Sequence, residues 1–241
     1  MEYHYTAIVL GKRDRADADR LYTLYTKESG KIHALAKGVR KMEAKLAGHL
    51  EDFMLSTITV VRTRGTGKIT ASVVEESFPH LRTNVDGLRT TYRALRLFHR
   101  LVGLEEKDQR LFRLLHEFLT AMDVLAKTQM HSQRMTFLSC IFLFKMFPLL
   151  GYDISFAVCV QCRRKLDAQG NAFHIQRGGI LCARCALAGM NGNISISANV
   201  IKALRLMRTN AIASLAKVRM PEADGKTLCA LAEQFAYSIL A

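Results

Sequence analysis

The chain has 241 residues, and its 35 lysines and arginines against 21 aspartates and glutamates give a formal net charge of +14. Apolar residues make up 49% of the sequence and charged residues 23%, which is typical of a globular protein and argues against disorder. No apolar run is long enough to predict a transmembrane helix, and the opening MEYHYTAIVLGKR does not resemble a signal peptide. We therefore expect a cytoplasmic protein without a membrane partner. The charge excess favours a polyanionic partner such as nucleic acid, with a basic protein that binds none as the alternative.

The residues before Pro79 predict a β-domain. Short segments rich in isoleucine, valine, threonine and tyrosine recur there, and two of them alternate between apolar and polar residues. In the first, Lys31 and Lys37 are expected to face outward. In the second, Ile69, Ala71 and Val73 are expected to face inward. The five predicted strands are residues 3–12, 19–27, 31–37, 53–63 and 68–77.

Between the third and fourth strands, the segment GVRKMEAKLAG at residues 38–48 predicts a short helix flanked by glycines. Three strands, a helix and two further strands is the order of an OB-fold, a five-stranded barrel that often binds oligonucleotides. An α+β, multidomain protein with an N-terminal OB-fold barrel is therefore predicted.

After Pro79 the apolar period becomes helical, so a helical bundle is expected. Its first helix has an apolar stripe at Val85, Leu88, Tyr92, Leu95, His99 and Val102. The second helix is expected over 107–128, and the third, over 131–147, is apolar enough to form the buried centre. Two more helices, over 196–208 and 222–239, close the chain. The predicted domains are the OB-fold at 1–80, the bundle at 81–150, a cysteine-rich segment at 151–190 and C-terminal helices packing on the bundle at 191–241.

Four of the six cysteines form two tight pairs, C-x2-C-x19-C-x2-C, which is the spacing of a zinc ribbon. Four thiolates fill a tetrahedral shell and leave no position for water, so a structural zinc ion is expected, one per chain. The alternatives are an iron–sulfur cluster or four reduced cysteines without metal, and His174 could replace one ligand. Cys140 and Cys229 are interpreted as thiols in the helical core. The predicted ligands are Cys159, Cys162, Cys182 and Cys185.

Basic residues concentrate in the first 45 positions, where they suit contacts to a nucleic-acid backbone on an OB-fold. Residues 1–80 nevertheless hold 13 basic and 10 acidic side chains, so the net excess there is small. Tyr22 and Tyr25 point to opposite faces of one strand, so at least one is expected to be in the core. A stripe of arginines at helical spacing follows, either as a solvated face or as a second anion-binding feature. The candidate DNA contacts are Lys12, Arg13, Arg20, Lys31, Lys37, Arg40, Lys41, Lys45, Arg89, Arg93 and Arg96.

No catalytic motif is found. The sequence Gly65-Thr-Gly-Lys68 lacks the spacing of a phosphate-binding loop, and no zinc-protease or deaminase motif occurs. The protein is therefore predicted not to be an enzyme.

The order of these features resembles the RecO family of DNA-repair proteins. The resemblance rests on the D-R-L-x-T-L-[FY]-T segment at residues 19–26 and the G-[KR]-x-x-A-x-A-[KR]-G-[AV]-[RK] segment at residues 30–40, with the mid-chain cysteines in support. It implies a cytoplasmic, nucleoid-associated protein of bacteria that binds single- and double-stranded DNA and anneals complementary strands.

The same resemblance implies partners. These are RecR, the single-stranded-DNA-binding protein through its acidic C-terminal tail, RecA indirectly, and RecF as a further candidate. Arg134 and Lys145 on the third helix are candidate contacts for that tail, although apolar residues beside them are also core candidates. The main alternative function is a zinc-ribbon OB-fold protein that binds RNA or acts in transcription. A nuclease with an unfamiliar metal motif and an adaptor without nucleic acid are the remaining readings.

Overall fold

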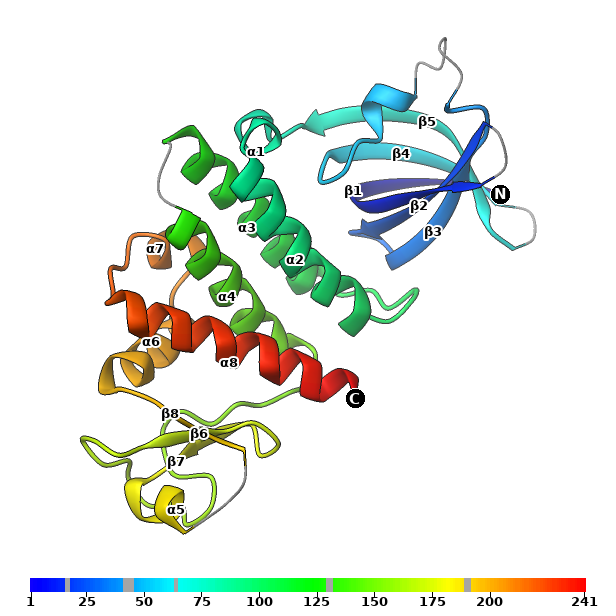
Figure 1. Cartoon of the computed structure of the whole chain (residues 1–241). Helices are drawn as coiled ribbons and strands as arrows, with labels where there is room; N and C mark the ends of the chain where they lie inside the picture. Colours follow the sequence, from blue (N-terminus) through cyan, green and yellow to red (C-terminus); the bar gives the residue numbers. More distant parts are fainter. Residues whose placement is uncertain (16–17, 41–45, 63–64, 129–131, 189–191) are drawn as a thin grey trace.

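The computed structural model describes residues 1–15, 18–40, 46–62, 65–128, 132–188 and 192–241. A β-barrel lies at one end of the molecule, a small sheet with a short helix lies at the other, and the helices lie between them (Figure 1). Among these described residues, no helix is both long and apolar enough to cross a bilayer.

The N-terminal barrel is closed and has the strand order β1-β2-β3-β5-β4, which confirms the predicted OB-fold architecture. Strands β3 and β5 pair in parallel and close the barrel, and the other neighbours are antiparallel. The strands are β1 (Glu2–Arg15), β2 (Asp19–Thr26), β3 (Gly30–Ala36), β4 (Leu55–Val61) and β5 (Gly67–Glu76).

The helix expected over 38–48 falls largely on residues 41–45, outside the described residues. Of its flanks, residues 38–40 form a turn, and a 3-10 turn, η1 (Ala47–His49), precedes β4. Lys41 and Lys45, two of the predicted DNA contacts, also lie outside the described residues.

The expected alternation in β5 is wrong beyond Ile69. Thr59 of β4 pairs with Ala71 and Val60 pairs with Ile69, so Thr70 is an extra residue that forms a bulge. A bulge turns the following residues to the opposite face. Ser72 is therefore buried, whereas Ala71 and Val73 are exposed.

The two tyrosines of β2 are both fully buried, but in different cores. Tyr22 packs inside the barrel, and Tyr25 belongs to the larger core that the helices form. Tyr25 contacts Phe98 edge-on, with the ring centroids 5.0 Å apart. The outer face of the barrel is thus covered by helices where β2 and β3 meet them.

The helical part is built around α4, which packs against α2, α3 and α8. As expected, α4 is buried on most sides, because nearly every residue from Met135 to Phe147 is apolar and inaccessible. The stripe predicted on α2 is partly wrong: Val85 and Tyr92 are exposed, and Thr91, Ala94 and Phe98 are buried instead. The helices are α1 (Pro79–Thr83), α2 (Val85–Leu101), α3 (Gln109–Lys127), α4 (Ser132–Leu149), α6 (Ala198–Thr209), α7 (Ile212–Leu215) and α8 (Glu222–Leu240).

The cysteine-rich segment forms a three-stranded antiparallel sheet, β6 (Ala172–His174), β7 (Gly179–Leu181) and β8 (Asn193–Ser195), with the short helix α5 (Ala183–Leu187). Strands β6 and β7 form a hairpin between the two cysteine pairs. Its turn contains Gly178 at φ +58°, a backbone conformation that favours glycine.

Cys140 and Cys229 form a disulfide, which corrects their interpretation as free core thiols. Cys140 lies on α4 and Cys229 on α8, and packing of the two helices brings their Cα atoms to 5.2 Å, within the range that a disulfide spans. The bond therefore links the centre of the bundle to the last helix.

Candidate nucleic-acid interface and metal centre

The four predicted metal ligands come together. The Sγ atoms of Cys159, Cys162, Cys182 and Cys185 all lie within 4.8 Å of one another, and the Sγ atoms of Cys162 and Cys182 are 3.7 Å apart. A tetrahedral ion with metal–sulfur bonds of about 2.3 Å requires sulfurs about 3.8 Å apart, so the cluster has the dimensions of a zinc site. Four cysteines in this arrangement can hold a metal ion, and zinc is compatible with them.

The pKa values of these thiols are also consistent with four cysteines that bind one cation. Burial and the neighbouring thiols raise the pKa of Cys185 to about 12. Burial acts in the same direction on Cys159, but hydrogen bonds from the backbone N–H groups of Cys162 and Cys182 outweigh it and lower the pKa to about 6. The site thus stabilises one thiolate readily and resists further negative charge, and a bound cation would remove that resistance.

His174 is not part of the cluster. It is buried in β6, and its Nδ1 accepts a hydrogen bond from the backbone N–H of Arg177 at 3.3 Å. The sequence did not draw attention to Asp167, whose carboxylate accepts a hydrogen bond from the Ala183 N–H at 2.8 Å, directly after Cys182. Asn171 holds Asp167 in turn through two hydrogen bonds to its main chain. This pair positions the second cysteine turn against the first.

On the barrel, several predicted DNA contacts gather where β1 ends, β2 begins and β3 ends. We call Arg13, Arg20, Lys37 and Arg40 the barrel rim. Arg13 pairs in register with Leu21, and Arg20 pairs with Asp14 on one side and Ala36 on the other. Arg13, Lys37 and Arg40 are exposed.

Carboxylates reduce the charge of part of this region. Asp14 accepts a hydrogen bond from Arg20 Nε at 2.8 Å and lies 3.6 Å from Arg40. The hydrogen bond from Arg20 lowers the pKa of Asp14. Lys12, half-buried nearby, pairs with Glu51. Arg13 and Lys37 are thus the rim cations most open to a phosphate.

Lys31 does not lie on an open surface, which corrects its assignment as a DNA contact. It is 7% exposed, and its ammonium donates hydrogen bonds to the carbonyl oxygens of His99 and Val102 at the C-terminal end of α2. The main chain takes part as well, because the Glu105 N–H donates to the Lys31 carbonyl at 2.8 Å. Burial lowers the pKa of the Lys31 ammonium. The residue holds the barrel against the helices and satisfies carbonyls that a helix end leaves unpaired.

The arginines of α2 are exposed, as predicted, but they are not without carboxylates. Arg93 forms an ion pair with Glu233 of α8. Arg89 lies 3.8 Å from Asp86, and Arg96 Nη2 donates to the Tyr237 hydroxyl at 3.4 Å. The stripe therefore runs beside α8 and helps to hold it.

The two candidate contacts for a partner tail are in different places. Arg134 lines a groove of about 1000 Å³ between α2, α4 and α8. Lys145, near the other end of α4, donates hydrogen bonds to the carbonyl oxygens of Met207 and Asn210, and burial lowers its pKa. Lys145 thus caps the end of α6 and does not share the groove with Arg134.

Two protein-family models match most of the chain. The family described as "Recombination protein O N terminal" matches residues 1–78, and that described as "Recombination protein O C terminal" matches residues 88–236. The chain belongs to the RecO family. Its barrel lies within the first match, and the helices from α3 to α7 lie within the second together with the cysteine cluster.

Curated RecO relatives cover most of the chain. A DNA repair protein RecO of Dehalococcoides mccartyi is 28% identical over 214 residues, which are 89% of this chain and 81% of the relative. That of Desulfitobacterium hafniense is 23% identical over 235 residues, 97% of this chain and 83% of the relative. That of Geobacter metallireducens is 30% identical over 183 residues, 76% of this chain and 72% of the relative.

Proposed function

We propose that this RecO-family chain is a non-enzymatic mediator of DNA repair and recombination that binds single- and double-stranded DNA and anneals complementary strands. The observation that carries the proposal is the match to both RecO family parts over a closed five-stranded barrel with exposed cations at one rim. Such barrels bind single strands by neutralising the phosphates with basic side chains and by stacking the bases on aromatic side chains. Its place of action would be the cytoplasm, at the bacterial nucleoid.

For the DNA surface we propose the barrel rim, chiefly Arg13 and Lys37. Arg40, which lies beside Asp14, and the exposed arginines Arg89 and Arg96 of α2 would be additional contacts. Each phosphate neutralised by a cation releases a bound counterion, so binding would weaken steeply with salt. Lys12 and Arg20 would contribute less because carboxylates already pair with them.

The partners we propose are RecR and the single-stranded-DNA-binding protein, with RecA as the recombinase loaded and RecF as a further candidate. The groove beside Arg134 has suitable chemistry for an acidic, apolar tail. Phe137, Val218 and Met220 supply apolar lining, and Arg219 lies among them. The zinc ion would hold the ribbon together and take no part in a reaction, because four cysteines leave it no open position.

Annealing of complementary oligonucleotides coated with the cognate single-strand-binding protein tests the proposal. We expect the wild type to accelerate annealing without nucleotide and without cutting labelled DNA. A Lys37→Ala/Arg40→Ala variant is expected to anneal at least about fivefold more slowly and to show a shallower salt dependence. The matched control is Lys107→Ala/Lys127→Ala, which removes the same charge from exposed positions away from the rim.

Failure of the wild type to anneal coated strands would overturn the mediator function. Tighter binding to RNA than to DNA of the same sequence would favour an RNA-binding or transcriptional role. Equal annealing rates for the rim variant and its control would show that the rim is not the DNA-binding surface.

A further inference from the structure

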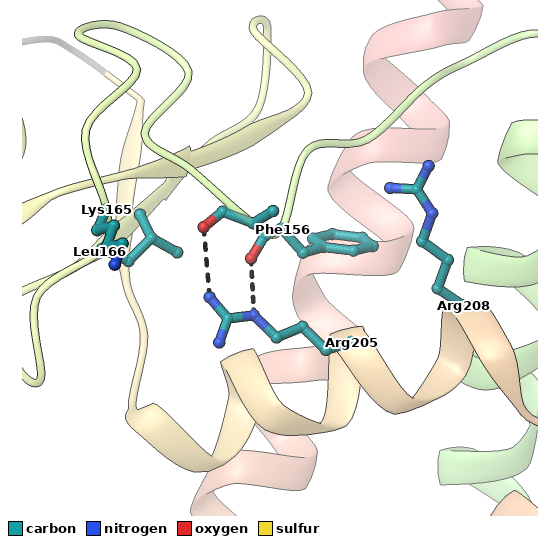
Figure 2. Close-up of a pocket in the computed structure, with 6 residues that line it drawn as sticks. Phe156, Lys165, Leu166, Arg205 and Arg208 are labelled. Carbon is teal, nitrogen blue, oxygen red and sulfur yellow. Dashed lines mark hydrogen bonds between the residues drawn. The ribbon is translucent and has the colours of Figure 1, made fainter.

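We call the cysteine-rich segment that contains β6, β7, β8 and α5 the cysteine ribbon. A second basic surface lies between this ribbon and α6, outside the sites described above. A hollow of about 500 Å³ is lined there by Lys165 from the ribbon and by Arg205 and Arg208 from α6. In Figure 2, Arg205 reaches from α6 to the main chain at Phe156, Lys165 lies on the opposite side of the hollow, and Arg208 lies further along α6. Three cations from two separate segments thus line one depression.

The surrounding sequence contains almost no opposing charge. From residue 168 to residue 221 there is no aspartate or glutamate, whereas seven lysines and arginines occur. The preceding carboxylate, Asp167, accepts a hydrogen bond from the Ala183 N–H inside the ribbon. Asp153 is 3.9 Å from Arg208 and is itself mostly exposed, so that pair is weak. The surface therefore keeps a net positive charge.

The cations have different tasks. Arg205 Nε donates to the Phe156 carbonyl at 2.9 Å and Nη2 donates to the Ala157 carbonyl, so this arginine fixes the ribbon to α6. Lys165 and Arg208 are exposed. Arg208 also lines a neighbouring hollow of about 350 Å³ that contains Arg110 and Arg113 of α3. That hollow also contains Glu117 and Asp153, and Arg110 pairs with Asp108, so the excess of positive charge is confined to the surface between the ribbon and α6.

The chemistry of the lining selects the ligand. Phe156 is 7% exposed, and Leu166 is partly buried against the core, so the hollow offers little apolar surface to a peptide side chain. What the surface offers is spaced positive charge, which suits the repeating phosphates of a polynucleotide and reads no base.

Building on the proposed annealing function, we propose that the surface formed by Lys165, Arg205 and Arg208 binds the phosphate backbone of a second DNA strand. The barrel rim would hold one strand and the ribbon–α6 surface the other. Annealing requires two strands on one protein or on two copies of it, and two separate anion-binding surfaces on one chain meet that requirement.

A tryptophan reporter tests the location directly, because the natural chain has no tryptophan. Ala157 is exposed and lines the hollow, so Ala157→Trp places the only indole there. The control is Val124→Trp, on the exposed face of α3. With a thymidine homopolymer as the probe, we expect salt-reversible quenching of the first indole and none of the second. Equal quenching of both, no quenching, or quenching by an acidic phenylalanine-containing peptide but not by DNA would overturn the proposal.

A second measurement uses Lys165→Ala/Arg208→Ala against the Lys107→Ala/Lys127→Ala control. Arg205 is left intact because it holds the ribbon. We expect annealing at least about fivefold slower than the control, and a salt slope for homopolymer binding smaller by about 1.4, for two lost contacts to a single strand. Annealing at the control rate would overturn the proposal while leaving the annealing function intact. If the wild type itself does not anneal, the annealing function fails, and the indole measurement alone still decides whether this surface binds DNA.

Discussion

The two ends of the molecule use their basic residues differently. Residues 1–80 hold 13 basic and 10 acidic side chains, and several cations of the barrel are already engaged. Lys12 pairs with Glu51, Arg20 with Asp14, and Lys31 with carbonyl groups of α2. Between residues 168 and 221, by contrast, cations occur without carboxylates.

This difference shows that the number of cations in a segment is a poor guide to its charge toward a partner. Several cations of the barrel already contact carbonyl groups or carboxylates of the protein itself. On the ribbon–α6 surface, by contrast, Lys165 and Arg208 are exposed. Most of the net positive charge of the chain therefore lies outside the barrel, although an OB-fold predicts the nucleic-acid contacts to be there.

The largest expected effect comes from removing the metal. Cys182→Ser, or chelation of the wild type, should abolish binding of one zinc per chain and unfold the ribbon, because structural zinc supplies on the order of 10 kcal/mol to small domains. Metal analysis and limited proteolysis, with cuts expected between residues 153 and 188, measure this. The barrel rim should still bind DNA.

The control for this experiment is Cys140→Ser/Cys229→Ser, which changes two cysteines outside the cluster and should retain the metal. A metal-free chain whose ribbon resists protease as well as the wild type does would contradict a structural role for zinc.

A smaller loss of stability is expected from the disulfide. Cys140→Ser/Cys229→Ser should lower the free energy of unfolding by about 2–4 kcal/mol, because the bond restricts a long loop in the unfolded chain. Urea unfolding without reductant measures it. A dithiol should destabilise the wild type and leave the double variant unchanged; equal responses of both proteins would mean that the bond is absent in solution.

The smallest effects are expected from single substitutions of Lys31 in β3 and of Lys37 in the turn that follows it. Lys31→Met should cost about 1–3 kcal/mol of stability, because the carbonyls of His99 and Val102 lose their donor, and it should leave the salt slope of DNA binding unchanged. Lys37→Ala should do the reverse, with stability within about 0.5 kcal/mol and a slope smaller by about 0.7. Thermal unfolding and anisotropy titrations measure the two quantities. A reduced slope for Lys31→Met would return that lysine to the DNA surface.

Local patterns in the sequence predicted the barrel and the metal cluster well. The five strands are separated by turns and rich in β-branched residues, and the four cysteine ligands lie in two short local motifs. The same patterns could not reveal the bulge at Thr70, because a bulge depends on how β5 pairs with β4. Division of the chain into four domains at residues 80, 150 and 190 stays a prediction.

Residues whose role depends on distant partners were the hardest to predict. Alternation correctly placed Lys31 on the outside of the barrel, but it could not show that the end of α2 covers that position. Cys140 and Cys229 are 89 residues apart, so only the packing of α4 on α8 reveals their pairing. For the ribbon–α6 surface a signal was present in the absence of acidic residues from 168 to 221, which a count over the whole chain conceals.

The disulfide also changes the connectivity of the chain. Because it joins residues 140 and 229, the cysteine ribbon, α6 and α7 all lie within one covalent ring that begins and ends in the helical bundle. A single peptide-bond cleavage anywhere in that ring opens it without releasing a fragment. The severed pieces would separate only after reduction, so the basic ribbon–α6 surface is tethered to α4 by two covalent routes.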